Sequence, residues 1–237
     1  QVCIGRVVEF AAIPGGEVLF IRREGWGESR HALYIWNIDR NEAAQIWSGE
    51  EVVRACATRA AQSICLMEGP IAPRRIVAID HDSGALRTLY DPNPELTQEA
   101  FIPAQKRQWR TPLGDEVFGY LLIPEGQAPW PLIVVQYRAL GFLRGGVGDE
   151  YPIQAFARAG FAVLARERPD PFALRARERS ADEIDRLEWS DLSERWRTLA
   201  ALTSGIETLV REGLVDGARV GVTGLSDGAE TAAFALI

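Results

Sequence analysis

The stretch that most constrains the fold runs from residue 220 to residue 231 and reads V-G-V-T-G-L-S-D-G-A-E-T. The apolar run that begins at Arg219 is typical of a short buried strand, and it breaks at the five residues Gly-Leu-Ser-Asp-Gly. After Gly228 the sequence continues with small, helix-favouring residues up to Ile237. A strand, a G-x-S-x-G turn and a helix in this order predict a nucleophile elbow with Ser226 at its tip.

The residue types around Ser226 fit this geometry. The serine of such an elbow lies on a tight, strained turn, where residues two positions away crowd the backbone. Only small side chains fit there, which explains Gly224 and Gly228. The helix that follows points unpaired N–H groups at the same place, where negative charge is stabilised. The alternative is a glycine-rich strand-to-helix turn without a catalytic role.

The composition indicates a globular chain. Its 237 residues are 47% hydrophobic and 25% charged, which fits one large or two small domains. The formal net charge of −7 argues against nucleic acid as the main partner. No apolar run has the length of a membrane span, and no signal peptide is visible. The chain begins with Gln1 and ends inside an expected helix, so we expect an internal piece of a longer protein.

The three cysteines do not indicate a metal site. Cys3, Cys56 and Cys65 form no C-x-x-C pair and have no histidine at metal-ligand spacing. We expect buried free thiols, with a Cys56–Cys65 bridge across a hairpin as the alternative in an exported protein.

Residues 1–96 read as short strands separated by turns. The Ile-Asp pairs at Asp39 and Asp80 lie 41 residues apart, and each is followed by a strand that ends in an aromatic residue. A repeat of about forty residues with four short strands is typical of a propeller blade, so we expect about two blades. A small β-sandwich is the alternative. The expected strands are residues 18–21, 32–38, 44–47, 52–58, 63–67, 75–79 and 85–90.

The two histidines, His31 and His81, both belong to this β region. One lies at a strand start and the other in a polar turn. We therefore expect both to be exposed, and neither to be a catalytic base.

Residues 97–237 read as alternating strands and helices after a turn-rich linker, D-P-N-P, at residues 91–94. Such alternation predicts a mainly parallel sheet with Ser226 at the carboxyl end of a central strand, where ligands bind. The pattern Ser180-x-x-Glu183 resembles a capping box, and Gly213 is a natural helix end. The expected strands are residues 117–123, 132–136, 161–165 and 219–223; the expected helices are residues 150–159 and one long helix from about 180 to 212.

Two further segments have unusual compositions. The glycine-rich residues 141–148 follow a strand but match neither a dinucleotide-binding motif nor a P-loop, and we assign them to the wall of the site beside Ser226. Residues 166–179 carry five arginines, and we interpret this segment as a solvated connection, with a substrate-facing rim as the alternative.

The order of these features resembles the prolyl oligopeptidase family of serine peptidases, in which a propeller precedes an α/β-hydrolase domain. The residues 213–226, G-L-V-D-G-A-R-V-G-V-T-G-L-S, look like that family's approach to its nucleophile. The strand end V-V-Q-Y at Tyr137 looks like the one that carries its oxyanion-hole tyrosine. Asp227 and Glu230 depart from the usual pattern, as do residues 136–152. Residues 136–152, together with G-L-S-D-G-A-E-T at residues 224–231, are similar to the lasso peptide isopeptidases. This subgroup opens the macrolactam ring of lasso peptides.

The resemblance implies a partial propeller in residues 1–96 and a truncated α/β-hydrolase domain in residues 97–237. It implies Ser226 as nucleophile, with the backbone N–H of Asp227 and the hydroxyl of Tyr137 as oxyanion-hole donors. It implies a peptide substrate and no cofactor or metal, in a soluble bacterial protein of the cytoplasm or periplasm. The oligomeric state is not indicated.

The catalytic triad is incomplete in this sequence. The eleven residues after Ser226 include no histidine, and no aspartate besides the adjacent Asp227. Because a serine needs a base to take its proton, we expect the 237 residues alone to be inactive and the parent protein to be active. The alternatives are a dipeptidyl peptidase, oligopeptidase or esterase of the same family, and a non-catalytic binding protein with a degenerate hydrolase domain.

Overall fold

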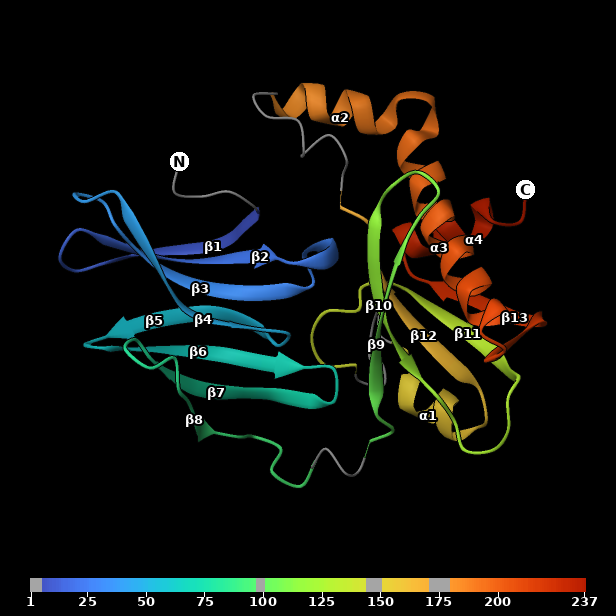
Figure 1. Cartoon of the computed structure of the whole chain (residues 1–237), viewed down its shortest axis with the longest axis horizontal. Coiled ribbons are helices and arrows are strands. Elements are labelled where there is room, and N and C mark those ends of the chain that lie inside the picture. Colours follow the sequence, from blue (N-terminus) through green and yellow to red (C-terminus); the bar gives the residue numbers. More distant parts are fainter. Residues whose placement is uncertain (1–5, 97–100, 144–150, 171–179) are drawn as a thin grey trace. The chain divides into compact units, whose positions relative to one another are not determined.

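The computed structural model describes residues 6–96, 101–143, 151–170 and 180–237. They form two compact units (Figure 1). The first comprises residues up to 101 together with 140–142, and the second comprises residues 102–139 and 143–237.

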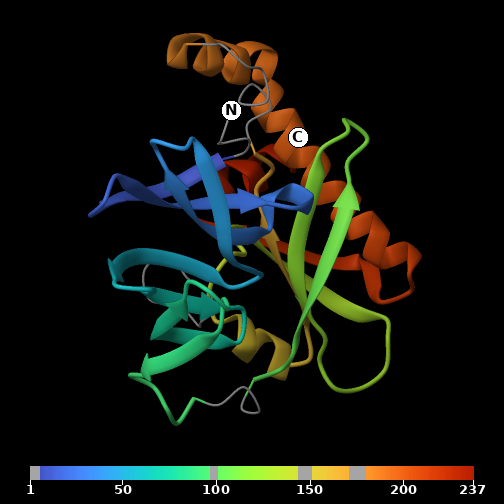
Figure 2. The same ribbon diagram turned by 60° about the vertical axis from the view of Figure 1, so that its left-hand side comes forward.

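The first unit consists of two four-stranded sheets. In each sheet the strands follow one another in chain order, and every neighbouring pair is antiparallel. Figure 2 shows the sheets as separate blue and cyan-to-green layers. One sheet contains β1 (Arg6–Ile13), β2 (Glu17–Glu24), β3 (Arg30–Asn37) and β4 (Glu42–Gly49); the other contains β5 (Val52–Arg59), β6 (Gln62–Gly69), β7 (Ala72–Asp80) and β8 (Leu86–Tyr90).

Alternating apolar residues hold the two sheets together. Side chains from both form one buried cluster, because every second residue of a strand points to the same face. The predicted repeat of four strands is thus present, and all seven predicted strands of this region are confirmed. β1 was not predicted, and its side chains are largely exposed. The cluster consists of Leu19, Ile21, Leu33, Val53, Cys65, Met67, Val77 and Ile79.

The expectation of free thiols is wrong for two of the three cysteines. Cys56 and Cys65 form a disulfide between β5 and β6, with their Cα atoms 4.1 Å apart. An irregularity in the register between Arg54 and Ala57 brings Cys56 opposite Cys65. The spacing of nine residues was compatible with such a hairpin bridge, but the bulge that aligns the two cysteines is not visible in the sequence. Cys3 lies outside the described residues.

The second unit is built on a five-stranded sheet with the order β13-β11-β12-β10-β9. β11 is parallel to β12 and β13, whereas β10 is antiparallel to both β12 and β9. The sheet is therefore mixed, and the prediction of a mainly parallel sheet is wrong. The strands are β9 (Ala104–Arg110), β10 (Glu116–Leu122), β11 (Trp130–Tyr137), β12 (Ala162–Glu167) and β13 (Val215–Gly224).

The connection between β10 and β11 explains this difference. Only residues 123–129 join them, without a helix. A parallel connection needs a dozen or more residues to return the chain to the starting edge of the sheet. β10 therefore runs against β11 and β12, and β9 extends the same edge by a hairpin that the sequence pattern did not reveal.

Among the residues that the structure describes, four α-helices accompany this sheet, and one of them ends earlier than predicted. They are α1 (Ile153–Arg158), α2 (Ala181–Trp189), α3 (Ser193–Arg211) and α4 (Asp227–Phe234). The predicted long helix is wrong, because a 3₁₀ turn at Ser190–Leu192 divides it, with Asp191 at φ 52° and Leu192 at φ 55°. The Ser180–Glu183 capping box is confirmed, and so is the helix end before Gly213, whose φ is +72°.

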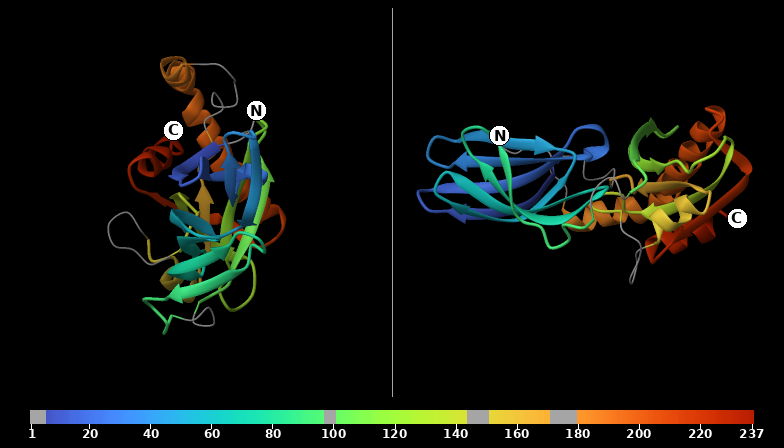
Figure 3. Two further views of the ribbon diagram at one scale, coloured as in Figure 1. Left: turned by 90° about the vertical axis from the view of Figure 1, so that its left-hand side faces the viewer. Right: turned by 90° about the horizontal axis from the view of Figure 1, so that it is seen from below.

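α3 covers one face of the sheet and positions the elbow. Its apolar residues, including Leu202 and Leu209, pack against β10, β11 and β12 in one buried cluster. α4 lies beside α3 (Figure 3). The ring centroids of Phe234 and Trp196 are 4.8 Å apart. The core of this unit consists of Trp109, Val117, Leu121, Leu132, Val134, Ala162, Leu164, Ala201, Leu202, Leu209 and Val215.

Candidate functional site

The predicted strand, turn and helix around Ser226 are present. The expectation of a buried, central strand is wrong, because β13 lies at the edge of the described sheet and only Val215 in it is buried. β13 ends at Gly224, α4 begins at Asp227, and Ser226 between them has φ 52° and ψ −118°. A non-glycine residue with positive φ is uncommon and costs on the order of 1–3 kcal/mol, so the surrounding structure must hold it. The side chain of Ser226 is exposed. The turn thus presents a hydroxyl group to solvent at the carboxyl end of a strand.

The glycines of the motif meet a steric requirement. A Cβ atom at Gly224 would lie 2.4 Å from the carbonyl carbon of Gly228 and 2.6 Å from its Cα. These distances are shorter than any real Cβ contact, so a side chain at this position would push the strand and the helix apart. Glycine at 224 is therefore what allows the elbow to be this tight.

The first turn of α4 begins directly at the serine. Ala229 and Glu230 donate their backbone N–H groups to the carbonyl oxygen of Ser226, at 2.9 and 3.1 Å. Asp227 is the first residue of the helix, where a backbone N–H has no acceptor inside the helix. That N–H lies next to Ser226 in the chain and is suited to bind negative charge.

The structure brings the end of β11 to the same edge of the sheet. β11 and β13 are parallel, and Gln136 lies opposite Gly224 in the register. Tyr137 is the next residue of β11 and pairs with Glu167 of β12. The backbone of Tyr137 is thus placed near the elbow, whereas its side chain lies outside what the structure describes. Its role in the oxyanion hole, like those of Ser226 and Asp227, stays a prediction.

A buried arginine lies beneath the elbow. Arg166 is fully buried in β12 and donates to the side-chain oxygen of Gln136, whose amide nitrogen donates to the carbonyl oxygen of Gly228 at 3.2 Å. Burial lowers the pKa of Arg166 to about 10, although the nearby carboxylates of Glu167 and Asp227 act in the opposite direction. The interpretation of residues 166–179 as a solvated connection is therefore wrong at its start, and residues 171–179 lie outside the described chain.

Ion pairs surround the residue that follows the serine. One carboxylate oxygen of Asp227 accepts from Arg195 at 2.6 Å, and the other accepts from Arg168 at 2.9 Å. Arg195 also donates to Glu230. Burial alone would lower the pKa of Arg195, but the hydrogen bond to Asp227 and the carboxylate of Glu194 outweigh it and raise the pKa.

The sequence did not predict Arg168, Arg195 or Gln136 as part of this site. The available signal was the unusual pair Asp227 and Glu230, because two acids on one face of a helix turn need cationic partners when they are not fully exposed. Their partners are Arg168, which directly follows β12, and Arg195 of α3, both far away in the sequence.

The two histidines have different environments, both in the first unit. His31 is only 5% exposed, so the expectation of an exposed residue is wrong for it. Burial, together with the positive charges of Arg23 and Arg54, lowers its pKa to about 4. The ring of His81 is half-buried, with Nε2 2.9 Å from the hydroxyl oxygen of Ser63.

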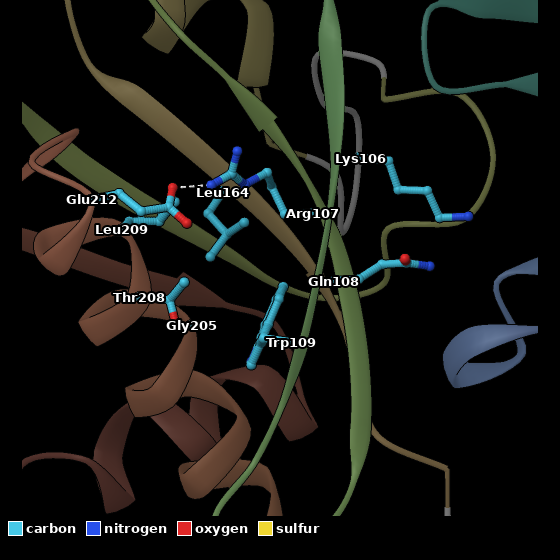
Figure 4. Close-up of a pocket in the computed structure, with 9 residues that line it drawn as sticks. All are labelled: Lys106, Arg107, Gln108, Trp109, Leu164, Gly205, Thr208, Leu209 and Glu212. Atoms are coloured by element: carbon cyan, nitrogen blue, oxygen red, sulfur yellow. Dashed lines mark hydrogen bonds and ion pairs between the residues drawn. The ribbon is translucent and has the colours of Figure 1, made fainter.

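A pocket of about 350 Å³ lies between β9 and α3, apart from the elbow (Figure 4). Trp109 and Arg107 face α3 there, and Glu212 pairs with Arg107 across its rim. None of Ser226, Asp227 and Tyr137 lines this pocket. The residues that do are Lys106, Arg107, Gln108, Trp109, Leu164, Gly205, Thr208, Leu209 and Glu212.

In the described parts of the chain, no three His, Cys, Asp or Glu side chains gather as metal ligands. None of the described helices is both long and apolar enough to cross a membrane. The wall that we assigned to residues 141–148 is only partly described: residues 140–142 belong to the first unit, and residues 144–148 lie outside the described chain.

No protein-family model matches the chain. Among curated proteins, it is 41% identical over 221 residues to the lasso peptide isopeptidase AtxE2 of Asticcacaulis excentricus, a match over 92% of this chain and 32% of that protein. The chain thus spans about a third of the length of this relative.

Solved structures of the same isopeptidase are also similar to this chain. The apo structure of the AtxE2 isopeptidase matches 98% of this chain and 36% of its own, with a TM-score of 0.86 and 39% identity. A variant of that isopeptidase with Astexin3-dC4 bound matches with a TM-score of 0.87. The acylaminoacyl peptidase of Pyrococcus horikoshii shares the fold, with a TM-score of 0.69 and 24% identity over 98% of this chain and 36% of its own. The predicted resemblance to the prolyl oligopeptidase family, and to lasso peptide isopeptidases within it, is confirmed.

Proposed function

We propose that the full-length form of this protein is a serine hydrolase that cleaves an amide bond through an acyl-enzyme. The observation that carries this proposal is the elbow, where Ser226 is held at positive φ between β13 and α4 with an exposed side chain. The similarity to an isopeptidase over 92% of the chain supports it. A turn of this geometry presents a nucleophile at the sheet edge where ligands bind in α/β folds.

In the proposed mechanism, the hydroxyl oxygen of Ser226 attacks the amide carbonyl, and a general base takes its proton. The negative charge that develops on the carbonyl oxygen is bound by the backbone N–H of Asp227 and the hydroxyl of Tyr137. The amine then leaves with a proton, and water hydrolyses the acyl-enzyme. Because no histidine follows Ser226 in this sequence, we propose that the base comes from outside these 237 residues.

The proposed substrate is a lasso peptide, cleaved at the isopeptide bond between its N-terminal amine and an Asp or Glu side chain. Isopeptide and main-chain amides present the same carbonyl chemistry, so the selection must come from the shape of the site. The support for this substrate is the similarity to AtxE2, which is named a lasso peptide isopeptidase.

We further propose that the two sheets of the first unit are blades of a propeller that includes additional blades. Each sheet leaves large apolar side chains exposed on its outer strands, among them Phe10 at 76% and Tyr90 at 60%. A blade cannot bury both of its faces alone. The sheet of the second unit would be part of an α/β-hydrolase domain. In this proposal, residues 1–96 and 97–237 are the two domains.

The test is hydrolysis of a lasso peptide, its linear form and a proline-containing dipeptide ester by the full-length protein, followed by mass spectrometry. We expect the lasso peptide to gain one water at the ring while the other two compounds react little. Ser226→Ala should abolish ring opening. Faster cleavage of the ester or the linear peptide would instead indicate an esterase or oligopeptidase, and ring opening by Ser226→Ala would exclude the mechanism.

A further inference from the structure

The charged side chains around the first turn of α4 form a closed network. The carboxylate of Glu194 forms ion pairs with Arg168, at 3.2 Å, and with Arg195, at 3.3 Å, and the same two arginines bind Asp227. Arg195 reaches Glu230 as well. Two guanidinium groups and three carboxylates thus meet at the residue after Ser226. Arg168 directly follows β12, and the other four residues belong to α3 and α4.

Most of this network is shielded from water. The side chains of Glu194 and Arg195 are 8% and 10% exposed, and that of Asp227 is 15% exposed. Charges at this depth are tolerated only when they are paired with good geometry, and removing one partner is costly. Planar guanidinium groups also fix the direction of their hydrogen bonds. The network therefore holds the Asp227 side chain in one orientation.

We propose that Arg168 and Arg195 are positioning residues for the hydrolytic reaction. Each binds one of the two carboxylate oxygens of Asp227. With both oxygens held, the first residue of α4 cannot rotate, and its backbone N–H stays directed at the carbonyl oxygen that Ser226 attacks. This inference rests on the proposed function, because it assigns Asp227 as an oxyanion donor.

A buried hydrogen bond from the side-chain amide of Gln136 to the carbonyl oxygen of Gly228 supports the same role. Together with the two arginines, it holds the turn from two sides against the strain of Ser226. The network also gives a reason for the acidic residue after the serine: an aromatic or amide side chain at position 227 lacks the two acceptor oxygens that Asp227 offers, one to each guanidinium group.

The network could instead only stabilise the fold, and enzyme kinetics separates the two roles. An oxyanion donor acts on charge that appears in the transition state, so its displacement lowers kcat and leaves KM nearly unchanged. Loss of a whole donor typically costs about 10²–10³ in rate. A displaced donor should cost less, on the order of 10- to 100-fold.

The experiment uses the full-length protein and a lasso peptide, with kcat, KM and the thermal midpoint measured for each variant. Arg195→Ala should lower kcat on the order of 10- to 100-fold with KM within about twofold. Added guanidinium ion should restore part of kcat, and Arg195→Lys should lie between wild type and Arg195→Ala.

Arg197→Ala is the matched control. Arg197 lies on the same helix and pairs with the fully buried Asp115, away from the elbow. Its loss should lower the thermal midpoint without lowering kcat at a temperature where the variant is folded.

The results distinguish the positioning role from the proposed function. If Ser226→Ala still opens the ring, the proposed function is wrong and the positioning role falls with it. If Ser226→Ala is inactive but Arg195→Ala keeps kcat within twofold of wild type, only the positioning role is overturned. A loss of kcat in Arg197→Ala as large as in Arg195→Ala, at a similar thermal midpoint, would also overturn it. Should Arg195→Ala not fold, Asp227→Asn takes its place, with the same fall in kcat expected.

Discussion

At the scale of residues, the candidate site depends on positions where the backbone geometry or the neighbouring charges restrict which side chain can be present. Ser226 has a strained backbone, and Gly224 has no space for a Cβ atom. The motif in the sequence was sufficient to predict both features, because the spacing of small residues reflects the crowding of the turn. It could not reveal Arg166, Arg168 or Arg195, since long-range ion pairs leave no periodic pattern.

Replacing Gly224 tests the steric part of this account. Gly224→Ala should lower the free energy of unfolding by about 1–3 kcal/mol, because its methyl group would overlap the backbone of Gly228. Gly221→Ala in the same strand is the control. Its Cβ would have its nearest neighbour, the carbonyl oxygen of Leu132, at 3.9 Å, so we expect a change within about 0.5 kcal/mol. Denaturant unfolding of both variants gives the comparison, and equal effects would contradict the account.

His31 makes the stability of the first unit depend on pH. Its pKa is about 4 in the folded protein, below its ordinary value of 6.5, because burial disfavours the charged ring. The unfolded chain therefore takes up a proton first as the pH falls. The contribution of His31 is complete above pH 6.5 and is lost between pH 6.5 and 4, by up to about 3 kcal/mol.

His31→Gln should remove this part of the pH dependence. The measurement is denaturant unfolding at pH 7 and at pH 4.5, for wild type and variant. We expect the wild type to lose more stability than the variant between the two pH values. An equal loss in both would show that His31 is not held neutral by burial.

At the scale of elements, apolar periodicity predicted most strands but not how they pair. Apart from β1, the strands of the first unit follow from alternating or continuous apolar runs, and so do β11, β12 and β13. β1 and β9 were missed because β1 is largely exposed and β9 carries polar and charged residues, K-R-Q-W-R, at residues 106–110. The short connection to β11 determines the direction of β10, and the apolar pattern does not indicate strand direction.

The break between α2 and α3 is the clearest failure of periodicity, because apolar spacing continues through it. Leu192 has φ 55° and is 52% exposed, a conformation that costs a residue with a Cβ atom roughly 1–2 kcal/mol. We expect Leu192→Gly to stabilise the protein or leave it unchanged in thermal unfolding. Arg186→Gly, at an exposed position inside α2, should destabilise it by about 1 kcal/mol. Destabilisation by Leu192→Gly of the same size as by Arg186→Gly would show that the helix is continuous.

At the scale of the whole molecule, the chain contains the elbow of the proposed hydrolase. It spans about a third of the length of AtxE2, and no histidine follows Ser226 in it. The order of a repeated β region, a linker and an α/β region, together with residues 213–226, carried the resemblance to the prolyl oligopeptidase family, because each part has its own periodicity.

We expect the 237-residue chain, expressed alone, not to open a lasso peptide, because its serine has no base to accept the proton. The measurement compares this chain with the full-length protein at equal concentration. Ring opening by the isolated chain at a rate near that of the full-length protein would show that the base lies within these residues.

The most direct test of the central claim is labelling of the full-length protein with a fluorophosphonate, followed by peptide mass spectrometry. We expect one adduct, on Ser226, that is absent in Ser226→Ala and forms more slowly in Arg195→Ala. An adduct on another serine, or equal labelling of the Ser226→Ala variant, would contradict the assignment of Ser226 as the nucleophile.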